Sequence, residues 1–126
     1  MEVLPYWLYK YIMWGEDVNI LEDPEDFPFE VTVKDLESNY DEVVDKFENY
    51  ITKLGLEVIS RTLVDCDLDD GYETYEFVIK LEGNYFKFKG SKDRYGYIES
   101  AEDVVVTKVR PVEKLITVYE AVVVPV

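Results

Sequence analysis

The hydrophobic pattern of the chain changes its period at Gly55, and this change constrains the fold more than any other feature of the sequence. Before Gly55, apolar residues recur at the spacing of one helical face, which predicts an amphipathic helix over 35–54. Thr32 or Asp35 suits the start of this helix, and Gly55 suits its end. After Gly55, apolar and polar residues alternate, which is the period of a strand with one buried face. The apolar helical positions are Leu36, Tyr40, Val43, Val44, Phe47, Ile51 and Leu54.

The region 56–124 is predicted to form an antiparallel sheet. We expect strands at 56–64, 72–81, 85–89, 104–110 and 115–124, with an acidic turn at 65–71 and a loop at 90–103. Gly83-Asn84 is a two-residue hairpin signal. Consecutive strands after a helix indicate an α+β fold, with helical segments packed on one face of a four- to five-stranded antiparallel sheet. A chain of 126 residues without internal repeats is expected to form a single domain over 1–126.

An aromatic segment, 1–15, opens the chain. Pro5 suits the first position of a helix and Gly15 its end, so a helical segment is expected here. Apolar residues cover nearly every side of this helix, and it has to cover part of the core. Burying all of its rings on one small domain is unexpected, so Trp7 and Trp14 are candidate interface anchors. The alternative is a terminal helix whose rings all serve the core.

Charge is the second unusual property, because 28 acidic residues against 13 basic ones give a net charge of −15. Residues 16–48, which include an acidic connector at 16–31, hold 13 acids and two lysines. Residues 80–94 carry a net charge of +3 from Lys80, Lys87, Lys89, Lys92 and Arg94 against Glu82 and Asp93. This balance disfavours nucleic acid and membrane as direct partners and favours a basic protein surface.

The outer side of the predicted helix is the candidate binding surface. Glu37, Asp41, Asp45 and Glu48 recur at helical spacing, so their carboxylates form a row with about 5–6 Å between neighbours. This spacing is close to that of successive backbone phosphates, and it suits a protein that imitates DNA. The connector adds flanking acids at Glu22, Asp23, Glu25 and Asp26. The alternative is an ordinary solvated helix exterior, which is always polar.

Catalytic machinery is not apparent, and we expect neither an enzyme nor a cofactor. The chain has no histidine and no glycine-rich phosphate loop. The turn from Asp65 to Asp70 partly resembles a calcium loop, with Glu76 at the twelfth position, but its glycine comes one place late. A solvated hairpin turn is the favoured interpretation. Cys66 is the only cysteine, so no intramolecular disulfide can form, and without a targeting or spanning segment we expect a cytoplasmic protein.

The C-terminal third resembles a β-module of small uncharacterised acidic proteins of tailed phages. The module has the pattern "YYKxxG … PVEKxxTVYE", and the matching stretches here are Tyr85–Gly90, Tyr95–Glu99 and Val109–Glu120. The likeness covers about residues 75–121, and the N-terminal half has no counterpart. It transfers no site residues. It implies a phage gene expressed in a bacterial host.

Two functions follow as hypotheses. The first is an acidic phage-type binding protein that inhibits or redirects a host nucleic-acid-handling protein, as a DNA mimic or anti-defence factor. The alternative is a self-associating structural or virion assembly protein, because a monomer with one acidic and one basic region can stack head to tail.

Overall fold

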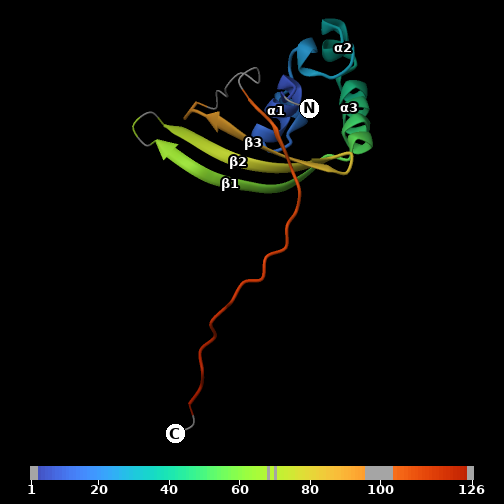
Figure 1. Cartoon of the computed structure of the whole chain (residues 1–126). Helices are drawn as coiled ribbons and strands as arrows, with labels where there is room; N and C mark the ends of the chain where they lie inside the picture. The colour runs from blue at the N-terminus through green and yellow to red at the C-terminus, as the bar shows by residue number, and fades with distance from the viewer. Residues whose placement is uncertain (1–2, 68, 70, 96–103, 125–126) are drawn as a thin grey trace.

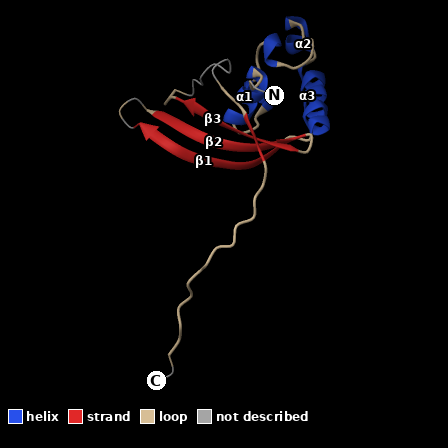
Figure 2. Ribbon diagram, viewed as in Figure 1, coloured by secondary structure: helices blue, strands red, loops and turns tan. Residues whose placement is uncertain are grey.

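The computed structural model describes residues 3–67, 69, 71–95 and 104–124, and it confirms the α+β class (Figure 1). The helices lie on one side of a four-stranded antiparallel sheet of order β1-β2-β3-β4 (Figure 2). The described elements in chain order are α1 (Tyr6–Met13), the 3-10 helices η1 (Val18–Ile20) and η2 (Pro24–Asp26), α2 (Val33–Ser38), α3 (Tyr40–Leu54), β1 (Glu57–Asp67), β2 (Tyr72–Leu81), β3 (Asn84–Lys92) and β4 (Thr107–Val109).

The predicted helix over 35–54 is two helices, because the backbone leaves the helical region at Asn39. Asn39 has φ −130° and ψ 34°, and it separates α2 from α3. Asparagine competes with helical hydrogen bonding through its own side chain, and α2 has no buried residue that would hold the two pieces in line. Of the two candidate caps, Thr32 is the one that is used, so α2 starts at Val33, two residues before the predicted start. The hydroxyl of Thr32 accepts from the Asp35 N–H, and the Asp35 carboxylate accepts from the Thr32 N–H.

The strands β1, β2 and β3 form one continuous meander. The two-residue turn between β2 and β3 is Glu82-Gly83, one position before the predicted Gly83-Asn84. Both turn residues have positive φ, 49° and 83°, which matches the twist of a tight hairpin. The N–H of Glu82 donates to the carbonyl of Leu54 at 3.0 Å, so the turn is tied to the end of α3.

Helix α1 packs directly on β3 through Tyr9. The Tyr9 ring is fully buried, and its hydroxyl accepts from the Ser91 N–H at 3.2 Å. Gly90 permits this approach, since a Cβ at that position would lie 2.9 Å from Cε2 of Tyr9. Gly90 therefore belongs to a packed strand and not to the loop predicted at 90–103, of which 96–103 lie outside the described residues.

The core consists of two clusters that meet at Trp7. The first lies between α1 and the inner face of the sheet, where Phe77 and Phe88 stack with ring centroids 5.0 Å apart. The second joins α1, the connector and α3 around Phe47, which is fully buried. Trp7 contacts both clusters and meets the Phe47 ring edge-on at 5.9 Å. The opposite face of the sheet is more polar, as expected for an antiparallel sheet covered on one side.

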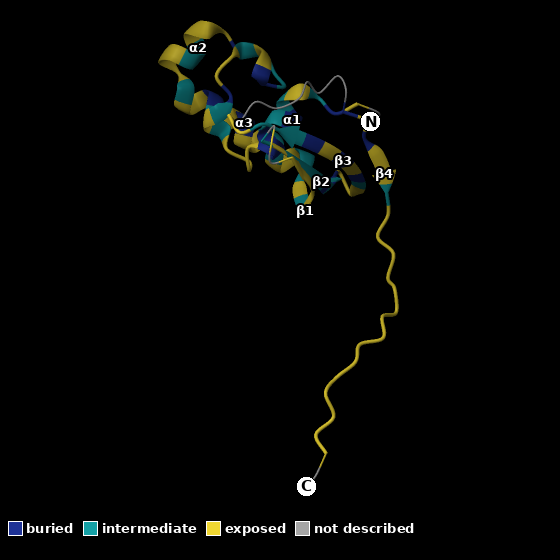
Figure 3. Cartoon of the chain, turned by 90° about the vertical axis from the view of Figure 1, so that its left-hand side faces the viewer, coloured by how far each residue is buried: buried dark blue, intermediate teal, exposed yellow. Residues whose placement is uncertain are grey.

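The predicted strand at 115–124 is wrong for this chain on its own. The strand predicted at 104–110 is confirmed only at β4, where Val109 pairs with Tyr85. Because β3 begins at Asn84, the chain beyond Val109 runs past the start of β3 and pairs with no other strand in the described part of the structure. Residues 110–124, called the C-terminal segment below, form neither helix nor strand and are exposed throughout (Figure 3).

Helices long and apolar enough to cross a membrane do not occur among the described residues.

Candidate acidic binding surface

The predicted row of carboxylates is divided between two helices. Asp41, Asp45 and Glu48 lie along one side of α3, whereas Glu37 lies on α2 beyond the break at Asn39. A single straight row of four is therefore wrong. All four side chains are exposed, and none forms an ion pair with a described residue.

The connector carries further exposed carboxylates, and their charges act on tyrosines of α1 and α3. Burial raises the pKa of Tyr40, and the charges of Asp17, Glu22 and Asp41 raise it further. Burial also raises the pKa of Tyr11, with added contributions from Glu16 and Glu48. Tyr11 of α1 and Tyr40 of α3 thus each feel the charge of at least one connector acid and of one acid on α3. We define the acidic surface as Glu16, Asp17, Glu22, Asp41, Asp45 and Glu48, all of which are exposed.

Glu16 and Asp17 belong to the acidic connector but were not among the candidate residues named from the sequence. Their signal was the acidic composition of 16–31, but no periodic spacing relates them to α3. Their position follows from the path of the connector after α1. Asp17 starts η1, and its carboxylate accepts from the Asn19 N–H at 3.0 Å.

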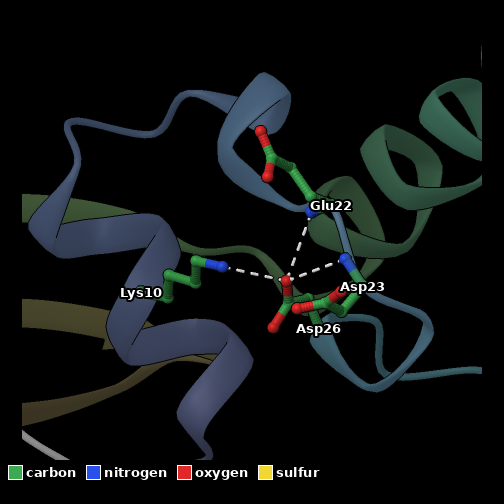
Figure 4. A network of polar contacts seen from close by, with 4 residues as sticks. All are labelled: Lys10, Glu22, Asp23 and Asp26. Atoms are coloured by element: carbon green, nitrogen blue, oxygen red, sulfur yellow. Dashed lines mark hydrogen bonds and ion pairs between the residues drawn. The ribbon is translucent and has the colours of Figure 1, made fainter.

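Asp26 was predicted to belong to the binding surface, and this is wrong. Only 3% of Asp26 is exposed. One of its carboxylate oxygens accepts from Nζ of Lys10 at 2.9 Å and from the N–H groups of Glu22 and Asp23 at 3.2 Å each (Figure 4). A buried carboxylate needs such partners to offset its loss of hydration. Asp26 therefore fastens the connector to α1, while Glu22, Asp23 and Glu25 remain exposed.

The two candidate anchor residues, Trp7 and Trp14, occupy different environments. Trp7 is half-buried between the two core clusters. Its remaining surface lines a groove of about 500 Å³ together with Pro5, Pro28, Tyr50 and residues at the turn between β2 and β3. Trp14 lies at the end of α1 and is 39% exposed. Trp7 is thus a packing residue first, whereas Trp14 is available to a partner.

The lysines of the hairpin lie on the sheet. Lys80, Lys87 and Lys89 alternate with Ile79, Phe86 and Phe88, which are buried against the helices. Their side chains therefore leave the sheet on the face opposite to the helices. These three lysines thus lie on the sheet's outer face, whereas Lys92 and Arg61 lie over the Tyr75 ring and four further lysines belong to the helices.

The acidic turn proposed as a calcium loop has a different structure. Asp65, Cys66 and Asp67 belong to β1 and are exposed, while Leu68 and Asp70 lie outside the described residues. In the part of the chain that the structure describes, no group of three or more acidic or cysteine side chains is arranged to hold a metal ion.

Comparisons with known proteins give no match: no family model fits the sequence, and no curated protein or solved structure is significantly similar to the chain. The fold and the surface together define an α+β protein with an exposed, uncompensated acidic surface built by a helix and the connector that packs beside it.

Proposed function

We propose that the protein binds a basic surface of another protein through its acidic surface. The observation that carries this proposal is that Asp41, Asp45 and Glu48 are exposed along one side of α3 and form no ion pair with a described residue, while Glu16, Asp17 and Glu22 of the connector are exposed as well. A partner's basic groups would approach carboxylates that already lie together. Complementary charge of this kind increases association rates and selects partners.

The arrangement has an energetic cost that a partner would remove. Carboxylates three or four positions apart on one helix, such as Asp41, Asp45 and Glu48, destabilise it by about 0.2–0.5 kcal/mol per pair. Asp41 recovers part of this in the first turn, where a negative charge suits the helix dipole. Asp45 and Glu48 have no such compensation within α3. Their burial against arginine or lysine side chains would convert repulsion into attraction.

The partner we propose is a nucleic-acid-handling protein of a bacterial host, bound in the cytoplasm and inhibited or redirected. Two considerations support this choice. The spacing along α3 is similar to that of backbone phosphates, which such proteins neutralise. The resemblance of 75–121 to a phage module implies a setting in which a host protein is the target.

Capture from a bacterial lysate tests the proposal. The immobilised chain is compared with a variant in which Glu16→Gln, Asp45→Asn and Glu48→Gln neutralise the acidic surface. The control is a second variant with Glu57→Gln, Glu76→Gln and Glu82→Gln. It changes the net charge by the same amount as the first variant, but at positions on the sheet and its β2–β3 turn. We expect basic proteins to be retained at low salt, released by a salt gradient, and lost in the first variant only, because screening weakens contacts between exposed charges. Equal capture by both variants would contradict the proposal.

A second function, a self-associating structural or assembly protein, is favoured by one separate observation. The C-terminal segment is exposed, its residues 115–124 are mostly apolar, and it pairs with no strand among the described residues. This observation does not involve the acidic surface.

A further inference from the structure

We propose that the C-terminal segment of one copy adds as an extra strand to the free edge of β1 in a second copy. This inference rests on the second function above and gives it a mechanism. The donor is residues 115–124, and the acceptor is the outer edge of β1.

The donor has the composition of a strand but lacks the environment of one. Residues 115–124 are rich in β-branched and aromatic side chains and contain one charged residue, Glu120. Tyr119 is 92% exposed and Val123 is 91% exposed. A contiguous apolar segment of this kind is unfavourable in water and marks an interaction site. The backbone groups of the donor also have no partner strand, because the pairing of β4 with β3 stops at Val109.

The acceptor is the longest unpaired edge of the sheet. β1 stands first in the strand order, so only its β2 side is hydrogen-bonded within the sheet. It has 11 residues and exposes Ile59, Leu63 and Val64. The ten residues of the donor span about 33 Å as a strand, close to the length of β1. An unpaired edge with exposed apolar residues is a ready template for another strand.

The charges favour antiparallel addition. β1 carries Arg61 in its middle and Asp67 at its end, and the segment carries Lys114 before the donor strand and Glu120 within it. Antiparallel alignment places Lys114 near the acidic end of β1 when Glu120 lies near Arg61. Parallel alignment with Glu120 beside Arg61 places Lys114 opposite position 55, before the start of β1 and far from Asp67.

Two irregularities in β1 explain why whole sheets would not pair edge to edge instead. The pairing with β2 shifts register between Val58 and Ser60 and again between Leu63 and Asp65. Bulges of this kind bend an edge and discourage the docking of another rigid sheet. A single segment without structure of its own can follow the bend. Donor and acceptor lie at opposite edges of the sheet, so a copy that donates its segment can still accept one from another copy. The copies therefore form an open chain unless they close into a ring.

Sedimentation velocity on the full chain across a wide range of concentrations tests the proposal. We expect the wild type to assemble as concentration rises and Val118→Pro to stay monomeric, since proline cannot donate to a strand ladder. Val112→Pro is the matched control, because it makes the same change in the exposed segment before the donor strand. Neither position contributes to the folded core, so loss of assembly cannot come from unfolding.

The outcomes separate the mechanism from the function on which it rests. A monomer at every concentration would overturn both self-association and strand addition. Assembly that persists in Val118→Pro would overturn strand addition and leave self-association standing. Leu63→Lys on the acceptor edge should also abolish assembly, whereas Val33→Lys, at an exposed apolar position on α2, should not.

Disulfide trapping then locates the contact, using the exposed Cys66 of β1 as the probe. A chain carrying Cys66→Ala and Leu115→Cys is mixed with the unaltered chain under oxidising conditions. Antiparallel addition places position 115 beside Cys66 of the other copy, and position 122 about 23 Å further along. A disulfide needs Cα atoms within about 7 Å, so Leu115→Cys should cross-link and Val122→Cys should not. Stronger cross-linking from Val122→Cys, or none from Leu115→Cys, would overturn the arrangement.

Discussion

Removing the carboxylate of Asp26 should destabilise the protein by about 3 kcal/mol, although Asp26 is one of many acids in a strongly acidic chain. In Asp26→Ala, three donors lose their acceptor: Nζ of Lys10 and the N–H groups of Glu22 and Asp23. Breaking a buried ion pair costs about 3–5 kcal/mol, and each unsatisfied buried donor about 1–3 kcal/mol. The Lys10 side chain is 19% exposed and can regain some hydration, which places the total at the lower end.

Urea unfolding followed by fluorescence of Trp7 and Trp14 measures this loss. For a domain of this size, about 3 kcal/mol corresponds to a decrease in Tm of roughly 10 °C. Glu25→Ala is the matched control, because Glu25 is an exposed acid in the same 3-10 helix, and it should leave the free energy of unfolding within about 0.5 kcal/mol of wild type. If Asp26→Ala were as stable as Glu25→Ala, the assignment of Asp26 as the fastening of the connector would be wrong.

Three smaller predictions use the same measurement of unfolding free energy. Glu48→Gln should stabilise the protein by a few tenths of a kcal/mol at low salt and by less at high salt, because it removes like-charge repulsion on α3; destabilisation would contradict this. Gly90→Ala should cost about 1–3 kcal/mol, because the added Cβ would press on the Met13 sulfur and on the Tyr9 ring. A neutral result would mean that α1, which carries both side chains, can move away. Hydrogen bonds from Thr32 lower the pKa of Asp35, so the stabilising contribution of its carboxylate is complete above about pH 4 and disappears as the pH falls through the lowered pKa. The difference in unfolding free energy between wild type and Asp35→Asn should therefore shrink below about pH 4. A difference that does not change with pH would exclude the cap as its source.

Local signals in the sequence predicted most of the elements correctly. Pro5 and Gly15 bracket α1, Thr32 and Asp35 form the predicted cap, and the alternation over 72–81 is β2. Each of these depends on a few neighbouring residues, which is why the sequence alone could show them.

The errors concern relations between segments that lie far apart in the chain. The strand at 115–124 was expected from composition, but a strand also needs a neighbour, and β3 begins at Asn84, too late to pair with these residues. Asp26 looked like its exposed neighbours, and only the approach of Lys10, 16 positions earlier, explains its burial. Glu16 and Asp17 joined the acidic surface through the path of the connector, which no periodic pattern encodes.

The central claim, that the acidic surface occupies a site made for nucleic acid, is tested most directly by competition. A host protein captured by the chain is bound to it again in the presence of increasing amounts of duplex DNA. We predict mutual exclusion: DNA displaces the wild-type chain as its concentration rises, whereas the variant Glu16→Gln, Asp45→Asn, Glu48→Gln does not bind the host protein even without DNA. A stable complex that holds the chain and DNA on the host protein together would contradict the proposed function.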